Sequence, residues 1–202
     1  GASWADYNND GFIDLFVANN NQNNFLYENN GDGSFTKITT GDIAGDGGNS
    51  YGASFADYNN DGFIDLFVSN WNQQNFLYEN QGNDNNWVNI VLNTTQTIGA
   101  RVSVKADISG RMSGRDVIRT RTSSWQFMEA VTEYAKFGLG DATIIDSIKV
   151  GWPTGEEQYL TDQSVNQFIT IIFPTPGCTD PSAINYDDTA MEDDGSCQYF
   201  NL

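Results

Sequence analysis

The sequence predicts an all-β protein made of several small sheets. Apolar runs of about four to eight residues alternate with Gly, Asn, Asp, Ser or Pro, which is typical of strands joined by turns. Residues 1–31 and 52–82 are nearly identical, and Asp57 follows Asp6 by 51 positions (57 minus 6), which indicates repeated supersecondary units. With 202 residues and 39% hydrophobic content, the chain can bury a core in more than one unit.

Each repeat has the pattern of four short strands. In the first repeat we expect strands near residues 3–5, 15–18, 24–28 and 34–39, separated by polar and Gly-rich turns. Four strands per unit are typical of a propeller blade. The segment GDIAGDGGNS at residues 41–50 should be the loop into the second blade. Residues 1–86 are therefore interpreted as two blades of the β-propeller type.

The composition changes after residue 86, where Asn gives way to Val, Ile, Arg and Thr. Apolar runs separated by turn residues continue to residue 173, so we expect a second all-β domain of the sandwich or barrel type at 87–175. Residues 176–202 should form a small acidic module. Its cysteines, Cys178 and Cys197, are the only two of the chain and predict one disulfide in an oxidising compartment; two unrelated free thiols are the alternative.

The formal net charge of −18 excludes several classes of partner. A charge of this sign repels nucleic acids and anionic membranes and attracts cations. No run of about 18 apolar residues occurs, so we expect no membrane span. The chain also has no histidine, which removes the commonest general base of enzymes.

The segment DYNNDGFID occurs at residues 6–14 and again at 57–65. Side-chain oxygens stand at positions one, three, five and nine, with Gly at six and a backbone carbonyl available at seven, which is the ligand order of a calcium loop. We therefore expect two Ca²⁺ sites. Their ligands would be Asp6, Asn8, Asp10, the Phe12 carbonyl and Asp14, and Asp57, Asn59, Asp61, the Phe63 carbonyl and Asp65.

These loops differ from an EF-hand, because position twelve is Val17, inside a predicted strand, and not a bidentate Glu. Ile13 should point inward and hold the loop to the core. The alternative is an acidic surface turn in which Asn and Asp only supply turn conformations. Three carboxylates about 4 Å apart would repel by about 4 kcal/mol per pair at a dielectric near 20. Lys37 is the only base before Arg101, so the metal site is favoured.

The loop followed by LFV and NFLYENNGDGSF resembles the FG-GAP or VCBS repeats of integrin-type β-propellers. The resemblance implies one Ca²⁺ per blade at the residues given above. Because a propeller needs several blades, we expect either further blades upstream of Gly1 or repeats that do not close into a ring. Residues 87–173, with IGARVSV, FGLGDA, VGWPTGEEQYL and NQFITI, resemble the ASPIC/UnbV domain, which implies an accessory or binding role.

The tail CTDPSAINYDDTAMEDDGSC resembles short modules of secreted bacterial surface proteins. Its oxygens could hold a further Ca²⁺, or they could serve only as a solvated acidic surface. The candidate residues are Asp180, Asn185, Asp187, Asp193 and Asp194.

Most of the basic residues form a strip within the second domain. They are Arg101, Lys105, Arg111, Arg115, Arg119 and Arg121. The strip could hold an anionic glycan, or it could pair with acidic neighbours and protect an edge strand from aggregation. Trp125 and Trp152 are expected in the core and not as platforms for a sugar.

The sequence favours an extracellular, calcium-binding, non-enzymatic module for adhesion or surface assembly. Its partner would be a protein or glycan at a cell surface or in a matrix, or another copy of the chain. The alternatives are an accessory domain of a secreted polysaccharide-active enzyme and a subunit of a surface filament. Glu156 and Glu157 are adjacent in a turn and Glu129 and Glu133 have no recognisable partner, so no carboxylate pair for glycoside hydrolysis stands out.

Overall fold

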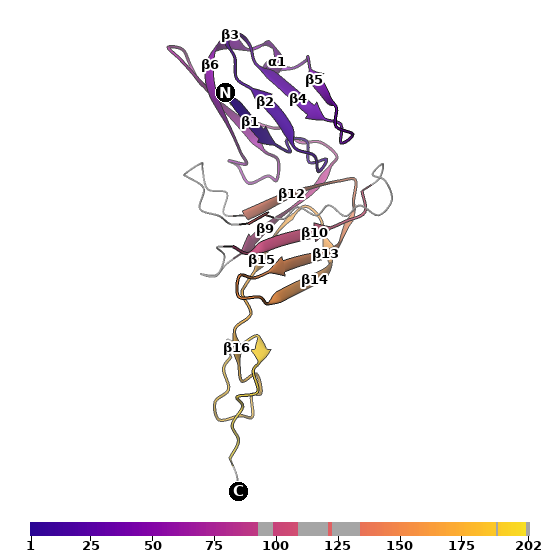
Figure 1. Ribbon diagram of the computed structural model, residues 1–202, viewed down its shortest axis with the longest axis vertical. Helices are drawn as coiled ribbons and strands as arrows, with labels where there is room; N and C mark the ends of the chain where they lie inside the picture. Colours follow the sequence, from indigo (N-terminus) through magenta and orange to yellow (C-terminus); the bar gives the residue numbers. More distant parts are fainter. Residues whose placement is uncertain (93–98, 109–120, 123–133, 189, 201–202) are drawn as a thin grey trace.

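The computed structural model describes residues 1–92, 99–108, 121–122, 134–188 and 190–200. Three parts follow one another along the long axis of the molecule (Figure 1). The sheets of the two repeats lie at one end, the second domain lies in the middle, and the C-terminal module lies at the other end. Within the described ranges the only α-helix is the single turn α1, Asp42–Gly45. The all-β class is therefore confirmed, and none of the sheets formed by the described residues closes on itself.

The first repeat forms a four-stranded antiparallel sheet in the order β1-β2-β4-β5. Its strands are β1 (Ala2–Ala5), β2 (Asp14–Val17), β4 (Phe25–Asn29) and β5 (Phe35–Ile38). The four strands expected from the sequence are all present. The register places Trp4 beside Leu15 and Leu15 beside Tyr27, so these side chains form one row across the sheet.

The second repeat also belongs to a four-stranded sheet, but one strand comes from the first repeat. The order is β3-β6-β7-β8, with β3 at Asn20–Asn23, β6 at Gly47–Ala56, β7 at Asp65–Asn70 and β8 at Phe76–Tyr78. The loop expected at 41–50 is shorter than predicted, because β6 already begins at Gly47. Residues 47–49 extend β6 to pair with β3, and this exchange links the two sheets.

The two repeat sheets pack face to face around a small apolar core. Its buried members are Phe16, Ala18, Leu26, Leu66 and Val68. The Phe16 ring meets the Phe55 ring edge-on, with 6.4 Å between the ring centroids. Equivalent residues of the two repeats have different surroundings. Phe16 is fully buried, whereas the equivalent Phe67 is 43% exposed. The face of the second sheet that carries Phe67 is turned away from the first sheet.

The second domain consists of two sheets around the main core. One sheet has the order β11-β10-β13-β14, with β10 at Arg101–Lys105, β11 at Arg121–Thr122, β13 at Ile144–Gly151 and β14 at Glu157–Ser164. The other has the order β12-β9-β15, with β9 at Asn86–Leu92, β12 at Tyr134–Gly140 and β15 at Gln167–Ile171. Alternate residues of both sheets, such as Ile90 and Ile148, meet in the core.

Trp152 is 4% exposed and belongs to this core, as the sequence predicted. Trp125, Glu129 and Glu133 lie outside the described residues. In the C-terminal module, β16 (Pro176–Gly177) pairs with β17 (Glu192–Asp193), and the predicted disulfide between Cys178 and Cys197 is present.

Replacing Phe16 with Ala should lower the free energy of unfolding by about 3 to 5 kcal/mol, because a fully buried aromatic ring is removed. Phe67→Ala is the matched control, since Phe67 has the same place in the second repeat but is 43% exposed. Its effect should be clearly smaller. Urea denaturation followed by tryptophan fluorescence measures both, and equal losses would contradict the packing of the two sheets.

Candidate metal centre

Both acidic loops, residues 6–14 and 57–65, have the same backbone conformation. The fourth and sixth positions are left-handed in each copy: Asn9 has φ 58° and Gly11 φ 85°, and Asn60 has φ 60° and Gly62 φ 89°. Asn tolerates this region and Gly adopts it without strain. The glycine at position six therefore permits the sharp turn on which the predicted ligand order depends.

The first aspartate of each loop closes the turn. The Gly11 amide donates to Asp6 Oδ2 at 3.0 Å, and the Gly62 amide donates to Asp57 Oδ2 at the same distance. The side chains at positions three and five bond to each other and to the backbone. Asn8 Oδ1 accepts from the Asp10 amide at 3.1 Å, and Asp10 Oδ1 accepts from the Phe12 amide at 2.7 Å.

The aspartate at position nine ties its loop to the end of the following hairpin. Asp14 Oδ2 accepts from the Tyr7 amide at 3.0 Å and Asp14 Oδ1 from the Asn29 amide at 2.8 Å. In the second copy Asp65 accepts from the Tyr58 and Asn80 amides at the same two distances. Each loop is thus fixed at its start by its own backbone and at its end by the residue that follows the apolar hairpin.

Four of the predicted ligand carboxylates are almost fully buried. Asp6 is 4%, Asp14 0%, Asp57 6% and Asp65 2% exposed. Burial raises the pKa of Asp14 to about 7, although the Asn29 and Tyr7 amides act in the opposite direction. Burial raises the pKa of Asp65 as well. The ionised forms of Asp14 and Asp65 are therefore costly unless a positive charge lies close to them.

One expectation about the loop is wrong. Ile13 is 39% exposed and does not point inward. Asp14 takes the inward position at the start of β2 because its carboxylate accepts two backbone hydrogen bonds, so its neighbour Ile13 points outward. The Phe12 ring packs over Gly31, where an added Cβ would lie 2.2 Å from the ring.

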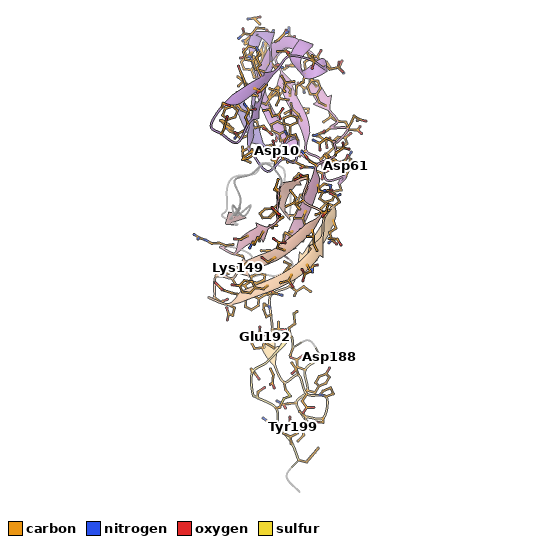
Figure 2. The ribbon with its side chains drawn as sticks, turned by 90° about the vertical axis from the view of Figure 1, so that its right-hand side faces the viewer. Asp10, Asp61, Lys149, Asp188, Glu192 and Tyr199 are labelled. Carbon is orange, nitrogen blue, oxygen red and sulfur yellow. A yellow bond between two sulfur atoms is a disulfide. The ribbon has the colours of Figure 1, made fainter. Side chains whose placement is uncertain are left out.

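The two loops meet each other and the second domain at one joint. Figure 2 shows Asp10 and Asp61 at the boundary between the repeat sheets and the second domain. Asn9 Nδ2 donates to the Gly62 carbonyl at 3.1 Å, which links the first loop to the second. The Gly140 amide, at the end of β12, donates to the Asn9 carbonyl at 2.8 Å.

Strand β12 contributes three more residues to the joint. Gly138 lies so close to the first loop that an added Cβ would be 2.7 Å from the Asn9 backbone. The Tyr134 hydroxyl donates to Asp57 Oδ2 at 3.4 Å. Lys136 Nζ donates to the Gly62 carbonyl and lies 5.3 Å from the centre of the Trp87 ring. The face of β12 and β9 that is turned to the repeats is therefore built against the acidic loops.

Lys136 is a half-buried cation beside these acids. Burial lowers the pKa of its ammonium group to about 8, and the charges of Asp57, Asp6 and Asp61 act in the opposite direction. The sequence did not predict a role for this lysine, because no motif in the residues around it points to the acidic loops. Asn29 and Asn80 were also missed, although the repeated ENNG and ENQG after each hairpin place an Asn at the same point of both copies.

The donor set of each loop fits a hard cation: three carboxylates, one amide oxygen and one carbonyl, with no nitrogen or sulfur ligand. Within the described ranges, no three Asp, Glu or Cys side chains already stand together as a metal site. The loop oxygens are held by backbone amides, but an oxygen that accepts one hydrogen bond keeps a second lone pair. The ten predicted ligand residues therefore remain a prediction.

The other predicted sites are less organised. In the C-terminal module, Asp180 Oδ1 accepts from Ser182, and Asn185 Oδ1 accepts from the Gln198 amide. These are turn-forming contacts, and they leave a further Ca²⁺ site untested. Of the basic strip, Arg101 and Lys105 are exposed on β10, the backbone of Arg121 belongs to β11, and the remaining members lie outside the described residues.

Two family models match this chain. Residues 6–68 match the FG-GAP-like repeat, and residues 91–176 match the ASPIC and UnbV domain. The first match is consistent with propeller-type blades, and the second covers most of the second domain. The C-terminal module lies beyond both matches.

Cartilage acidic protein 1 from Mus musculus is 25% identical over 184 residues, which cover 84% of this chain and 28% of that protein. The protein of the same name from Homo sapiens is 25% identical over 184 residues, covering 84% of this chain and 27% of its own length. That from Xenopus tropicalis is 38% identical over 66 residues, 32% of this chain and 10% of that protein. The chain thus spans little more than a quarter of the length of the first two relatives.

The two domain types and the disulfide between Cys178 and Cys197 indicate an extracellular module. In the described part of the chain, no helix has the length and apolar character needed to cross a membrane.

Replacing Gly138 with Ala should separate β12 from the first loop, because the new methyl group meets the Asn9 backbone. We expect a loss of about 1 to 3 kcal/mol in the free energy of unfolding. Gly151→Ala is the control: Gly151 ends β13 of the same domain and has nothing within 4 Å of an added Cβ. It should stay within about 1 kcal/mol of wild type in thermal or urea unfolding. Equal effects of the two substitutions would argue against the close contact at Gly138.

Proposed function

We propose that this protein is an extracellular, calcium-binding, non-enzymatic module that serves adhesion or surface assembly. The observation that carries the proposal is the pair of identical loops, each with two buried aspartates. Among the described residues, Lys136 contacts the second loop at the Gly62 carbonyl. Buried carboxylates without full neutralisation cost free energy, and a divalent ion between them removes that cost.

In each loop the bound ion would be held by the three aspartates, the asparagine side chain and the carbonyl at position seven. Bound Ca²⁺ supplies two positive charges and a flexible oxygen coordination shell, which suits a carboxylate-rich loop better than the stricter geometry of Mg²⁺ does. Extracellular modules bind Ca²⁺ with dissociation constants of roughly 10⁻⁴ to 10⁻³ M. Such sites fill outside cells, which agrees with the extracellular location.

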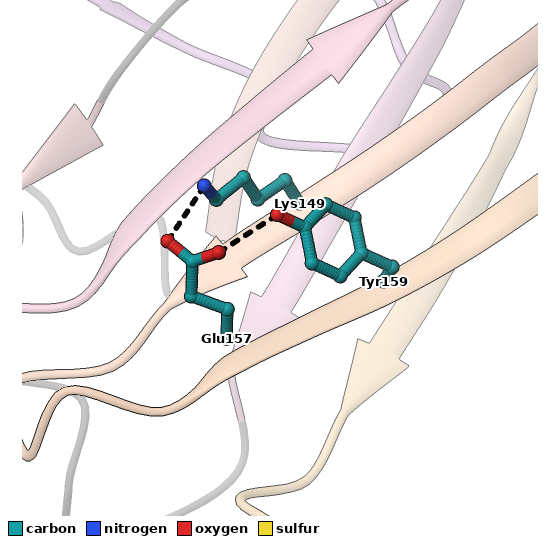
Figure 3. Close-up of polar contacts among 3 residues, drawn as sticks. All are labelled: Lys149, Glu157 and Tyr159. Atoms are coloured by element: carbon teal, nitrogen blue, oxygen red, sulfur yellow. Dashed lines mark hydrogen bonds and ion pairs between the residues drawn. The ribbon is translucent and has the colours of Figure 1, made fainter.

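A non-enzymatic role is supported by the state of the acids that sequence reasoning considered for catalysis. Glu157 is engaged on both oxygens: Lys149 Nζ lies 2.6 Å from Oε1, and the Tyr159 hydroxyl donates to Oε2 at 2.8 Å (Figure 3). The bond from Lys149 holds the pKa of Glu157 below its usual value. A general acid for glycoside hydrolysis needs the opposite shift.

A binding surface for the partner is offered by exposed aromatic side chains on the second repeat. Tyr51 is 56% and Trp71 68% exposed, and their ring centroids are 6.2 Å apart. Large exposed aromatic residues are enriched where proteins bind ligands. We infer that a protein or glycan at a cell surface or in a matrix is the partner, in keeping with the name of the relatives.

Calcium should raise the melting temperature of the wild-type protein relative to chelator. At free Ca²⁺ a hundredfold above the dissociation constant, each site adds about 2.7 kcal/mol. Asp10→Asn and Asp61→Asn should each lose part of this gain, because each removes one charged ligand from one loop. Asp146→Asn is the control, since it changes the charge equally on an exposed position of β13.

Differential scanning calorimetry with and without Ca²⁺, together with isothermal titration, measures these effects. Two titrated sites in wild type and one in each loop variant are expected. A wild-type protein that takes up no Ca²⁺ at millimolar concentration would overturn the proposed function.

A further inference from the structure

Lys136 lies beside the acidic loops, although it belongs to the second domain. It contacts the second loop at the Gly62 carbonyl, and the charges that act on it come from both loops, through Asp6, Asp57 and Asp61. The Gly62 carbonyl also accepts from Asn9 of the first loop at 3.1 Å. One oxygen atom thus joins the first loop, the second loop and β12.

Two fully buried polar side chains lie next to this contact. Asn89, which is paired in register with Lys136, is fully buried, and neither its Nδ2 nor its Oδ1 has a hydrogen-bond partner among the described residues. Asn9 is fully buried too. In a joint that is partly shielded from solvent, a charge acts more strongly on its neighbours than it would at a fully exposed surface.

We propose that Lys136 is a built-in counter-cation of both acidic loops. Its ammonium group competes with the bound ions for the negative charge of the loop carboxylates. This rests on the proposed binding of Ca²⁺ by the loops. Without Ca²⁺, the loops attract the ammonium group and so hold the second domain against the repeats. Each Ca²⁺ that enters adds two positive charges near Lys136, so ion binding weakens this attraction. By linkage, Lys136 lowers the Ca²⁺ affinity of the loops by the same factor.

The sign of the effect separates this role from ordinary packing. Removing a lysine that only fills space would lower stability equally with and without Ca²⁺ and would leave the affinity unchanged. Removing a counter-cation lowers stability mainly in chelator and makes Ca²⁺ bind more tightly. Removing the charge of Lys136 also removes its repulsion of the nearby Ca²⁺. By Coulomb's law we expect the dissociation constant for Ca²⁺ to fall on the order of fivefold relative to wild type.

The chain offers a matched control lysine in the same domain. The Lys149 side chain is 41% exposed and pairs with Glu157 (Figure 3). Figure 2 shows Lys149 away from Asp10 and Asp61. Lys149→Met therefore makes the same chemical change as Lys136→Met, but outside the joint. Lys136→Arg restores the charge and tests whether the positive charge, and not the shape of lysine, is needed.

The experiment compares wild type, Lys136→Met, Lys136→Arg and Lys149→Met at pH 7, below the lowered pKa of Lys136. Calorimetric melting in chelator and in millimolar CaCl₂ gives stability, and titration with CaCl₂ gives affinity. Lys136→Met should melt lower than Lys149→Met in chelator, approach it in Ca²⁺, and bind Ca²⁺ more tightly. Lys136→Arg should restore wild-type values.

Two results would overturn the inference: unchanged Ca²⁺ affinity in Lys136→Met, or an equal loss of stability with and without Ca²⁺. A wild-type protein that binds no Ca²⁺ would be a different failure, because it refutes the proposed function and the competition together. The counter-cation role would then be decided by the chelator measurement, in which Lys136→Met must be less stable than Lys149→Met.

Discussion

The repeats of this protein are organised around the carboxylates of Asp14 and Asp65. Each side chain accepts one backbone amide from the start of its loop and one from the residue after the following hairpin. One buried carboxylate therefore holds three features in place: the loop, the strand that begins with the aspartate, and the end of the hairpin that follows. The same burial that gives these contacts their strength makes the negative charge of the two carboxylates costly.

Repetition of the sequence does not reproduce the environment. Phe16 and Phe67 occupy equivalent positions, yet one is fully buried between two sheets and the other is 43% exposed. Asp10 is half-buried, whereas its equivalent Asp61 is exposed. Each blade has two faces and only one of them is covered by the other blade, so the neighbours of a residue depend on which repeat contains it.

The turns of the two loops and the strands of the first repeat could be predicted from the sequence because short-range patterns define them: closely spaced Asp and Asn residues, a glycine at position six and alternating apolar residues. The joint could not, since Gly62 and Lys136 are 74 residues apart and nothing local marks either one as a contact. Strand β3 was missed because Asn20–Asn23 has no apolar alternation and is held by backbone pairing to β6. Ile13 was misplaced because a polar neighbour, Asp14, took the inward position.

The parallel pairing of β15 with β9 has a mechanical consequence. Strand β9 enters the second domain from the repeats, and β15 leaves it toward the C-terminal module, so the first and last strands of this domain lie side by side and run in the same direction. Tension between the two ends of the molecule would slide these strands along each other and strain all their hydrogen bonds together. Peeling them apart one bond at a time needs less force, so the topology suits a protein that is pulled from both ends.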